Sequence, residues 1–427
     1  MKKGKIEEIL TMIAGRGSIL VFFIMAFEVM IMISPFAFFF YSVFNPVFKW
    51  LNQYAATKWL TSFFLPHMIL PPTLFLKTVR ILGSAFFIIG ALSFIMCALQ
   101  VYLGKIFKWG IVNKGLYISI RHPQYLSLGI WGIGMSILWP RFIVLASLSL
   151  MFILYYFLAK DEERRMLNQY DDSYKKYMDN TGMFLPKFIE SRVALPGRFV
   201  ASPLMKFVTI PIIIVTVVIG TGFFLRTVTV NSLPLTSKNN ITLVSMLPED
   251  NVLVASALDG IIKAQAAGKL DSLKDNKDYF GYLMSPDYIM QGMIADTDKE
   301  FHLFKHHHTV AMISDWVLHP FQHLRTSPSF HMAKMHGADP AVARRHHCPL
   351  GINDPSLTCE TCPYRRVIMV EIDSDNGKRL SGKQLLSFNT TRTPIYSIDI
   401  NTKTGEILNA KKVEKATAWK DVPTPAI

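Results

Sequence analysis

Residues 114–186 decide the fold, and they read KGLYISIRHPQYLSLGIWGIGMSILWPRFIVLASLSLMFILYYFLAKDEERRMLNQYDDSYKKYMDNTGMFLP. Two apolar runs lie inside this stretch, at about 126–139 and 142–158, and Pro140-Arg141 separates them. A Pro-Arg pair between apolar runs predicts a tight turn at a membrane face. The chain is therefore expected to cross the membrane and return at once, as a helical hairpin.

Polar residues gather on both sides of this hairpin. The sequence has GLY at 115–117 and RHPQY at 121–125 before it, and EERR at 162–165 and FLP at 184–186 after it. Because a hairpin returns to the surface from which it started, the two groups are expected side by side at one membrane surface. Arginine, histidine, tyrosine and paired carboxylates at such a place form a candidate site.

The composition describes a polytopic membrane protein with a soluble part. The chain has 427 residues, 51% of them hydrophobic, and a mean hydropathy of +0.28. The formal net charge is +14, but the basic residues before the hairpin and those after it lie in alternate loops, as cytoplasmic loops require. This placement argues against nucleic-acid binding and predicts a cytoplasmic N-terminus.

The predicted fold is an all-α polytopic bundle of about five transmembrane helices, followed by a small α+β extracytoplasmic domain. The expected spans are 18–44, 74–103, the two arms of the hairpin and 204–225, and several of these runs are near the roughly 20 residues needed to cross a bilayer. Gly83 and Gly90 in the second span are small residues that allow close helix contact. Residues 46–72 are expected to lie in the membrane interface. The Met1-Lys2-Lys3 start and the outward-facing tail favour a bacterial inner membrane.

The tail differs from the rest of the chain. Residues 248–273 have a helical pattern, and 366–372 and 395–400 alternate apolar and polar residues as strands do. Lys403-Thr404-Gly405 predicts a turn after the last of these. The tail is therefore expected to place its helices first and a meander of strands last.

Ten of the twelve histidines fall between residues 302 and 347, and three of the four cysteines lie close to them. Such residues could hold zinc or haem. A plain disulfide with surface histidines is the main alternative, and a redox-active Cys-x-x-Cys is a third. Pro363 replaces the histidine of the usual covalent haem motif. The candidate metal ligands are His302, His306, His319, His323, His347, Cys348, Cys359 and Cys362.

The polar groups around the hairpin resemble those of the isoprenylcysteine carboxyl methyltransferases and their relatives, the membrane phospholipid methyltransferases. The resemblance covers roughly residues 80–187, and it departs at Asp171, where the family usually has glycine. The matching residues are Gly115, Tyr117, Arg121, His122, Pro123, Tyr125, Glu162, Glu163, Met166, Tyr170, Tyr174, Tyr177, Phe184 and Pro186.

This resemblance implies transfer of a methyl group from S-adenosylmethionine to a carboxylate or amine of a lipid or lipidated acceptor. A sulfonium is already activated, so the protein mainly has to align the reactants and exclude water, and no metal is needed. The implied catalytic residues are Arg121 and Glu163. The implied cofactor-binding residues are Tyr117, His122, Pro123, Tyr125, Glu162 and Glu163.

The domains are then a membrane methyltransferase-like domain at 1–200, a fifth transmembrane helix at 201–227 and a His/Cys-rich α+β domain at 228–427. The latter could bind partners in a membrane complex. A rival hypothesis is a membrane-anchored metal- or haem-binding protein for redox or assembly work, in which the methyltransferase-like bundle is a scaffold. In a simpler alternative, Arg121 and His122 are interface residues and Glu162 and Glu163 a solvated helix start.

Overall fold

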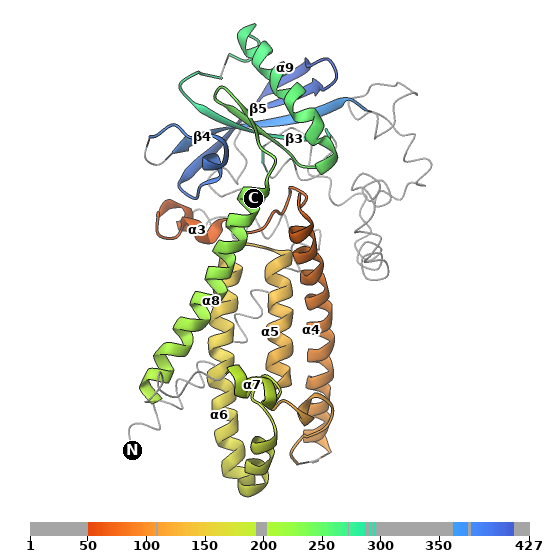
Figure 1. Ribbon diagram of the computed structural model, residues 1–427, viewed down its shortest axis with the longest axis vertical. Helices are drawn as coiled ribbons and strands as arrows, with labels where there is room; N and C mark the ends of the chain where they lie inside the picture. Colours follow the sequence, from red (N-terminus) through yellow and green to blue (C-terminus); the bar gives the residue numbers. More distant parts are fainter. Residues whose placement is uncertain are drawn as a thin grey trace. The chain divides into compact units, whose positions relative to one another are not determined.

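The computed structural model describes residues 50–107, 110–193, 203–271, 273–286, 291, 294–295, 362–374 and 377–413. The first expected span, at 18–44, lies outside the described residues. The chain divides into two compact units. Of the described residues, 78–224 belong to a helical unit, and 50–77 together with 225–413 belong to a unit that contains a sheet (Figure 1).

The helical unit consists mainly of apolar residues. Its long helices are α4, α5 and α6 (Figure 1). Among the described residues, three helices are long and apolar enough to cross a membrane, over Leu74–Val101, Phe142–Asn180 and Val208–Ser232. The helices that the unit contains or shares are α4 (Leu74–Ile106), the short η1 (Gly115–Ile118), α5 (Pro123–Leu138), α6 (Phe142–Asn180), α7 (Lys187–Val193) and the first part of α8 (Pro203–Ser232).

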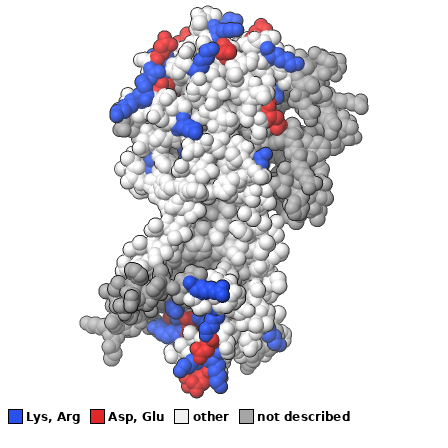
Figure 2. All heavy atoms as spheres, viewed as in Figure 1, with Lys and Arg blue, Asp and Glu red and all other residues white. Residues whose placement is uncertain are grey.

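The helical hairpin predicted from Pro140-Arg141 is confirmed. Helix α5 ends at Leu138 and α6 begins at Phe142, and the two helices contact each other. The first arm has 16 residues, fewer than the roughly 20 that a perpendicular span needs. The second arm continues for 39 residues and carries the polar residues after the hairpin on the same helix as the apolar ones. In Figure 2 the charged side chains of this unit gather at one end.

Glycines allow α4 and α5 to pack backbone against backbone, as expected for Gly83 and Gly90. A methyl group added at Gly90 would lie 2.4 Å from the backbone nitrogen of Trp131, and one added at Gly134 would lie 2.4 Å from that of Phe87. Neither backbone can move away without separating the helices. These glycines therefore determine how closely α5, whose start carries the candidate site, packs against α4.

Gly90→Ala is expected to destabilise the helical unit by about 1–3 kcal/mol, because an overpacked contact with rigid backbone cannot relax locally. Thermal unfolding of the purified full-length protein measures the change. Gly220→Ala in α8 is the matched control, since among the described residues a methyl group there meets no atom within 4 Å apart from its own helix backbone. The control should be neutral or slightly stabilising, as alanine favours helix. Equal effects at both glycines would contradict the close contact.

The second unit contains one six-stranded mixed sheet in the order β1-β2-β3-β4-β5-β6. Strands β2 and β3 are parallel, and every other neighbouring pair is antiparallel. The strands are β1 (Thr236–Lys238), β2 (Ile241–Ser245), β3 (Asp278–Met284), β4 (Tyr364–Ser374), β5 (Thr390–Asn401) and β6 (Glu406–Lys412). The predicted strands at 366–372 and 395–400 and the turn at 403–405 are confirmed, and β1, β2 and β3 were not predicted.

Each face of this sheet has its own core. Helix α9 (Val254–Ala266), preceded by the 3-10 helix η3 (Pro248–Leu253), covers one face with Leu258 and Ile261 (Figure 1). The other face contacts Leu233 at the end of α8 and the short helix η5 (Gly382–Leu386).

Part of the segment at 46–72, expected in the membrane interface, also belongs to that second core. Its helix α3 (Lys58–Thr61) has four residues, and Met68 and Ile69 further along pack under the sheet. The Leu70 amide donates to the carbonyl of Met246, 2.9 Å away. This segment is therefore built into the sheet unit.

Candidate functional site

A short backbone pairing joins the two polar groups of the hairpin. Ile120 and Gly182 form an isolated parallel bridge. The Arg121 amide donates to the carbonyl of Gly182 at 2.8 Å, and the His122 amide donates to that of Met183 at 3.1 Å. Since residues 182–183 directly follow α6, this pairing fixes the start of α5 beside the polar part of α6. The predicted return of the chain thus brings the two groups together.

Arg121 is the buried cation of this site. Its Nε donates to Oε1 of Glu163 at 2.7 Å, with side-chain exposures of 9% and 4%. Its Nη1 donates to the carbonyl of Met178 at 3.1 Å and also to that of Thr181. One guanidinium therefore neutralises a carboxylate and caps the end of α6, which excludes an exposed interface position for this arginine.

His122 lies between the two carboxylates. Its Nδ1 is 3.3 Å from Glu162 and its Nε2 is 3.7 Å from Glu163, and 3% of the residue is exposed. Neither nitrogen makes an aligned hydrogen bond within the described part of the chain. Burial lowers the pKa of His122, but its close contacts with both glutamates outweigh burial and raise the pKa above its ordinary value. The ring thus favours the imidazolium form beside two anions.

Aromatic rings continue the site along the hairpin. The Tyr125 hydroxyl donates to Glu162 at 2.5 Å, and its ring stacks on His122 and on Tyr155, with centroids 5.6 Å and 4.9 Å apart. Tyr155 was not predicted, because a tyrosine within an apolar run gives no local signal. The Tyr117 hydroxyl donates to Gln124 at 3.0 Å and so points to a neighbour other than the acidic pair.

Pro123 has a structural position in the same group. It is the first residue of α5, where its missing amide hydrogen costs nothing and its fixed φ suits a helix start. His122 is the residue before the helix. The proline therefore fixes where α5 begins and, with it, the position of His122 directly before the helix.

Asp171 interrupts α6 with a backbone conformation that favours glycine. Its φ is 43° and its ψ is −122°, inside an otherwise helical segment. A side chain with a Cβ is strained in this region. The departure from the family pattern noted in the sequence therefore falls at a position where the chain bends before returning to Gly182.

Asp171→Gly is expected to raise the free energy of unfolding by about 1 kcal/mol, because glycine adopts this conformation without strain. Asp171→Ala removes the carboxylate but keeps the Cβ, and it should leave the strain in place. Thermal unfolding of both variants separates the two contributions. If alanine stabilised as much as glycine, the carboxylate and not the backbone would be responsible.

The proposed metal ligands of the tail lie outside the described residues, except for Cys362. Cys362 is buried and disulfide-bonded, which removes the free thiolate that zinc would require at this position. Among the described residues no group of three or more histidine, cysteine or acidic side chains could hold a metal ion. The disulfide at Cys362 argues against this residue as a metal ligand, and it fits both a plain disulfide and the oxidised form of a redox-active Cys-x-x-Cys.

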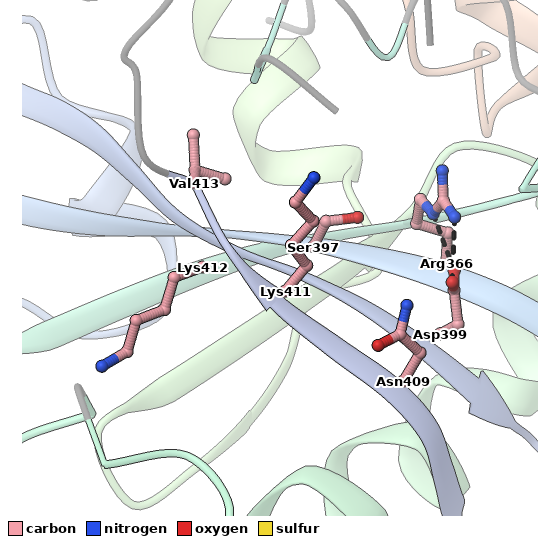
Figure 3. A pocket seen from close by; sticks show the side chains of 7 residues that line it. All are labelled: Arg366, Ser397, Asp399, Asn409, Lys411, Lys412 and Val413. Atoms are coloured by element: carbon pink, nitrogen blue, oxygen red, sulfur yellow. Dashed lines mark hydrogen bonds and ion pairs between the residues drawn. The ribbon is translucent and has the colours of Figure 1, made fainter. Parts of the chain in front are cut away.

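A polar pocket of about 100 Å³ lies on the sheet unit (Figure 3). Arg366 and Asp399 lie at one side of it and form a bidentate ion pair, at 2.7 Å and 2.9 Å. The rest of the pocket is lined by Ser397, Asn409, Lys411, Lys412 and Val413. Because Arg366 and Asp399 satisfy each other, they offer a ligand little free charge.

No protein-family model, curated protein or solved structure matches this chain.

Proposed function

We propose that the chain is an integral-membrane methyltransferase that uses S-adenosylmethionine and acts on a carboxylate or amine of a lipid or lipidated acceptor. The observation that carries the proposal is the convergence of Arg121 and His122 with Glu162 and Glu163 next to a lipid-compatible helix pair. The spacing of these residues, which resembles that of the membrane methyltransferases, gives the convergence a chemical meaning. The convergence also argues against the simpler alternative, in which Arg121 and His122 are separate residues of the membrane interface.

The residues present suit this cofactor. His122 has two buried nitrogens without aligned hydrogen bonds in the described part of the chain, so it has donor capacity for a ligand. Glu162 and Glu163 are acceptors for ribose hydroxyls or an amino group, and the Tyr125 ring offers a stacking face. When bound, S-adenosylmethionine supplies a methyl group activated by its sulfonium.

The protein's own contribution is placement and exclusion of water. Arg121 holds the buried Glu163 in one orientation, and the rings of His122, Tyr125 and Tyr155 stack beside the acidic pair. An aligned donor and acceptor in a dry site account for much of the rate of a displacement at carbon. The acceptor enters from the lipid, beside the apolar arms of the hairpin.

The test is calorimetric binding of S-adenosylmethionine to the purified full-length protein and to Glu163→Gln. The isosteric change removes the charge that faces Arg121 and His122, so binding should weaken about 10- to 100-fold. Asp161→Asn is the matched control, because Asp161 lies on the same helix and pairs with Arg164 and Arg165 instead. Absence of binding by the wild-type protein, together with a tightly held metal or haem seen by absorbance and metal analysis, would favour the rival redox or assembly protein.

A further inference from the structure

Helix α7 exposes two large apolar side chains next to the candidate site. Phe188 is 64% exposed and Ile189 is 37% exposed, in a helix of 7 residues. At about 3.6 residues per turn, Arg192 lies on the same side of the helix as these two residues, and Glu190 lies on the other side. The exposed side of α7 therefore combines an apolar pair with a cation, which is the pattern of a helix that lies on a surface.

The other side of α7 is joined to the candidate site through Glu190. A carboxylate oxygen of Glu190 accepts the amide hydrogen of Met183 at 2.5 Å. The Met183 carbonyl in turn accepts the amide hydrogen of His122 at 3.1 Å. A methyl group at Gly182 would overlap the Glu190 carboxylate, so the loop fits closely around this side chain. Two consecutive hydrogen bonds thus link the position of α7 to the position of His122.

A second exposed apolar pair precedes the site. In η1, Leu116 and Ile118 are exposed, whereas Tyr117 between them is buried. The Gly182 amide donates to the carbonyl of Ser119, directly after η1, at 3.1 Å. Helix η1 and helix α7 are therefore attached to the same loop, and both expose apolar side chains near the start of α5.

The place and the charge of these residues select a lipid bilayer as the partner. Helix α6 is one of the helices that could cross a membrane, and α7 is attached to the site where its apolar part meets polar residues. Interfacial helices bury an apolar face at such a level. Lys187 and Arg192 of α7 are exposed, while the Glu190 carboxylate is engaged by the loop. Anionic headgroups attract basic residues in this position.

We propose that α7 is a membrane-surface helix, in which Phe188 and Ile189 enter the headgroup layer of an anionic bilayer and Glu190 transmits this contact to His122. Glu190 is then a positioning residue of the site. The membrane contact does not depend on the methyltransferase function. Its consequence for catalysis, a site that is better ordered at an anionic membrane, rests on the function proposed above.

The membrane contact is tested with the full-length protein in nanodiscs of phosphatidylcholine, with or without phosphatidylglycerol. A spin label on Ile189→Cys reports depth through its relaxation by oxygen and by a water-soluble nickel chelate, and wild-type protein treated with the label corrects for native cysteines. Lys175→Cys is the matched control, because Lys175 is an exposed residue at the polar end of α6. The label at 189 should respond mainly to oxygen, and the control label should respond mainly to nickel.

Two results overturn the membrane contact. A label at 189 that responds to nickel as strongly as the control label shows that α7 faces water. A label at 189 that is shielded from both reagents shows that protein covers the helix.

The link to the site is measured by hydrogen exchange of the peptides that contain His122 and Met183, which requires no methyl donor. In wild-type protein, phosphatidylglycerol should slow this exchange about 5-fold, the effect of one basic residue near an anionic surface. Arg192→Gln should remove the lipid dependence, and the matched change Lys175→Gln should preserve it. Equal lipid dependence in wild-type protein and Arg192→Gln contradicts the proposal.

Glu190→Ala should remove the lipid dependence of exchange at the site while a label at 189 still responds to oxygen. Glu190→Gln keeps an acceptor oxygen for the Met183 amide and should retain most of the dependence. Full lipid dependence in Glu190→Ala would exclude Glu190 as the positioning residue. Failure of the methyltransferase function is seen separately, as S-adenosylmethionine that binds in neither bilayer while exchange still depends on the lipid.

Discussion

Arg121→Ala is expected to weaken S-adenosylmethionine binding about 10- to 100-fold and to lower the free energy of unfolding by about 3–5 kcal/mol. The loss arises because Glu163 would keep its charge in a buried position without its closest counterion, 2.7 Å away. The carbonyls of Met178 and Thr181 would lose their donor as well. Binding calorimetry and thermal unfolding of the full-length protein measure the two effects separately.

Arg165→Ala is the control for this change, because Arg165 lies on the same helix and pairs with Asp161 while 62% of its side chain is exposed. Exposed pairs of this kind add little to stability. We therefore expect neither binding nor unfolding to change measurably. If Arg121→Ala proved as mild as this control, the buried network would not organise the site.

Asp399→Ala is expected to produce the largest effect in the sheet unit, again about 3–5 kcal/mol. It would leave the Arg366 guanidinium, now paired at 2.7 Å and 2.9 Å, buried beside Gln291 without a carboxylate. The paired change Arg366→Met with Asp399→Leu should recover most of the loss, because an apolar pair carries no desolvation cost.

Hydrogen exchange of peptides from β4 and β5 in the full-length protein gives the local readout for Asp399→Ala. Faster exchange should be confined to these strands and their neighbours. Asp259→Ala serves as the control, since Asp259 forms an exposed pair with Lys238. A double variant less protected than the single one would show that the ion pair itself is required.

The proximity of the two polar groups was predictable from the sequence because they lie at the two ends of one hairpin. Pro140-Arg141 predicted the turn, and the apolar runs on either side predicted that the chain returns to the surface from which it started. The bridge between Ile120 and Gly182 was not predictable, because a pairing of single residues has no pattern. The stacking of Tyr155 on Tyr125 arises from the helix contact and is equally invisible in the sequence.

The sheet was predictable where its sequence alternates apolar and polar residues or ends in a turn. Strand β5 combines buried and partly buried positions, strand β6 combines partly buried and exposed ones, and the turn before β6 has a characteristic composition. Strand β3 is buried at every position, so it has no alternation of period two and resembles any short apolar run. The contribution of Met68 and Ile69 to the sheet's core was missed because it depends on a contact far along the chain.

The part of α6 that precedes Asp171 has a mechanical consequence for the methyltransferase that we propose. Glu163 lies 21 residues after Phe142, which is about 30 Å along a helix and close to the thickness of the hydrocarbon layer. In that proposal, a helix of this length fixes the acidic pair at one depth relative to the opposite leaflet. A thinner or thicker bilayer would then shift the carboxylates relative to the headgroups, and acyl-chain length would control which acceptors reach them.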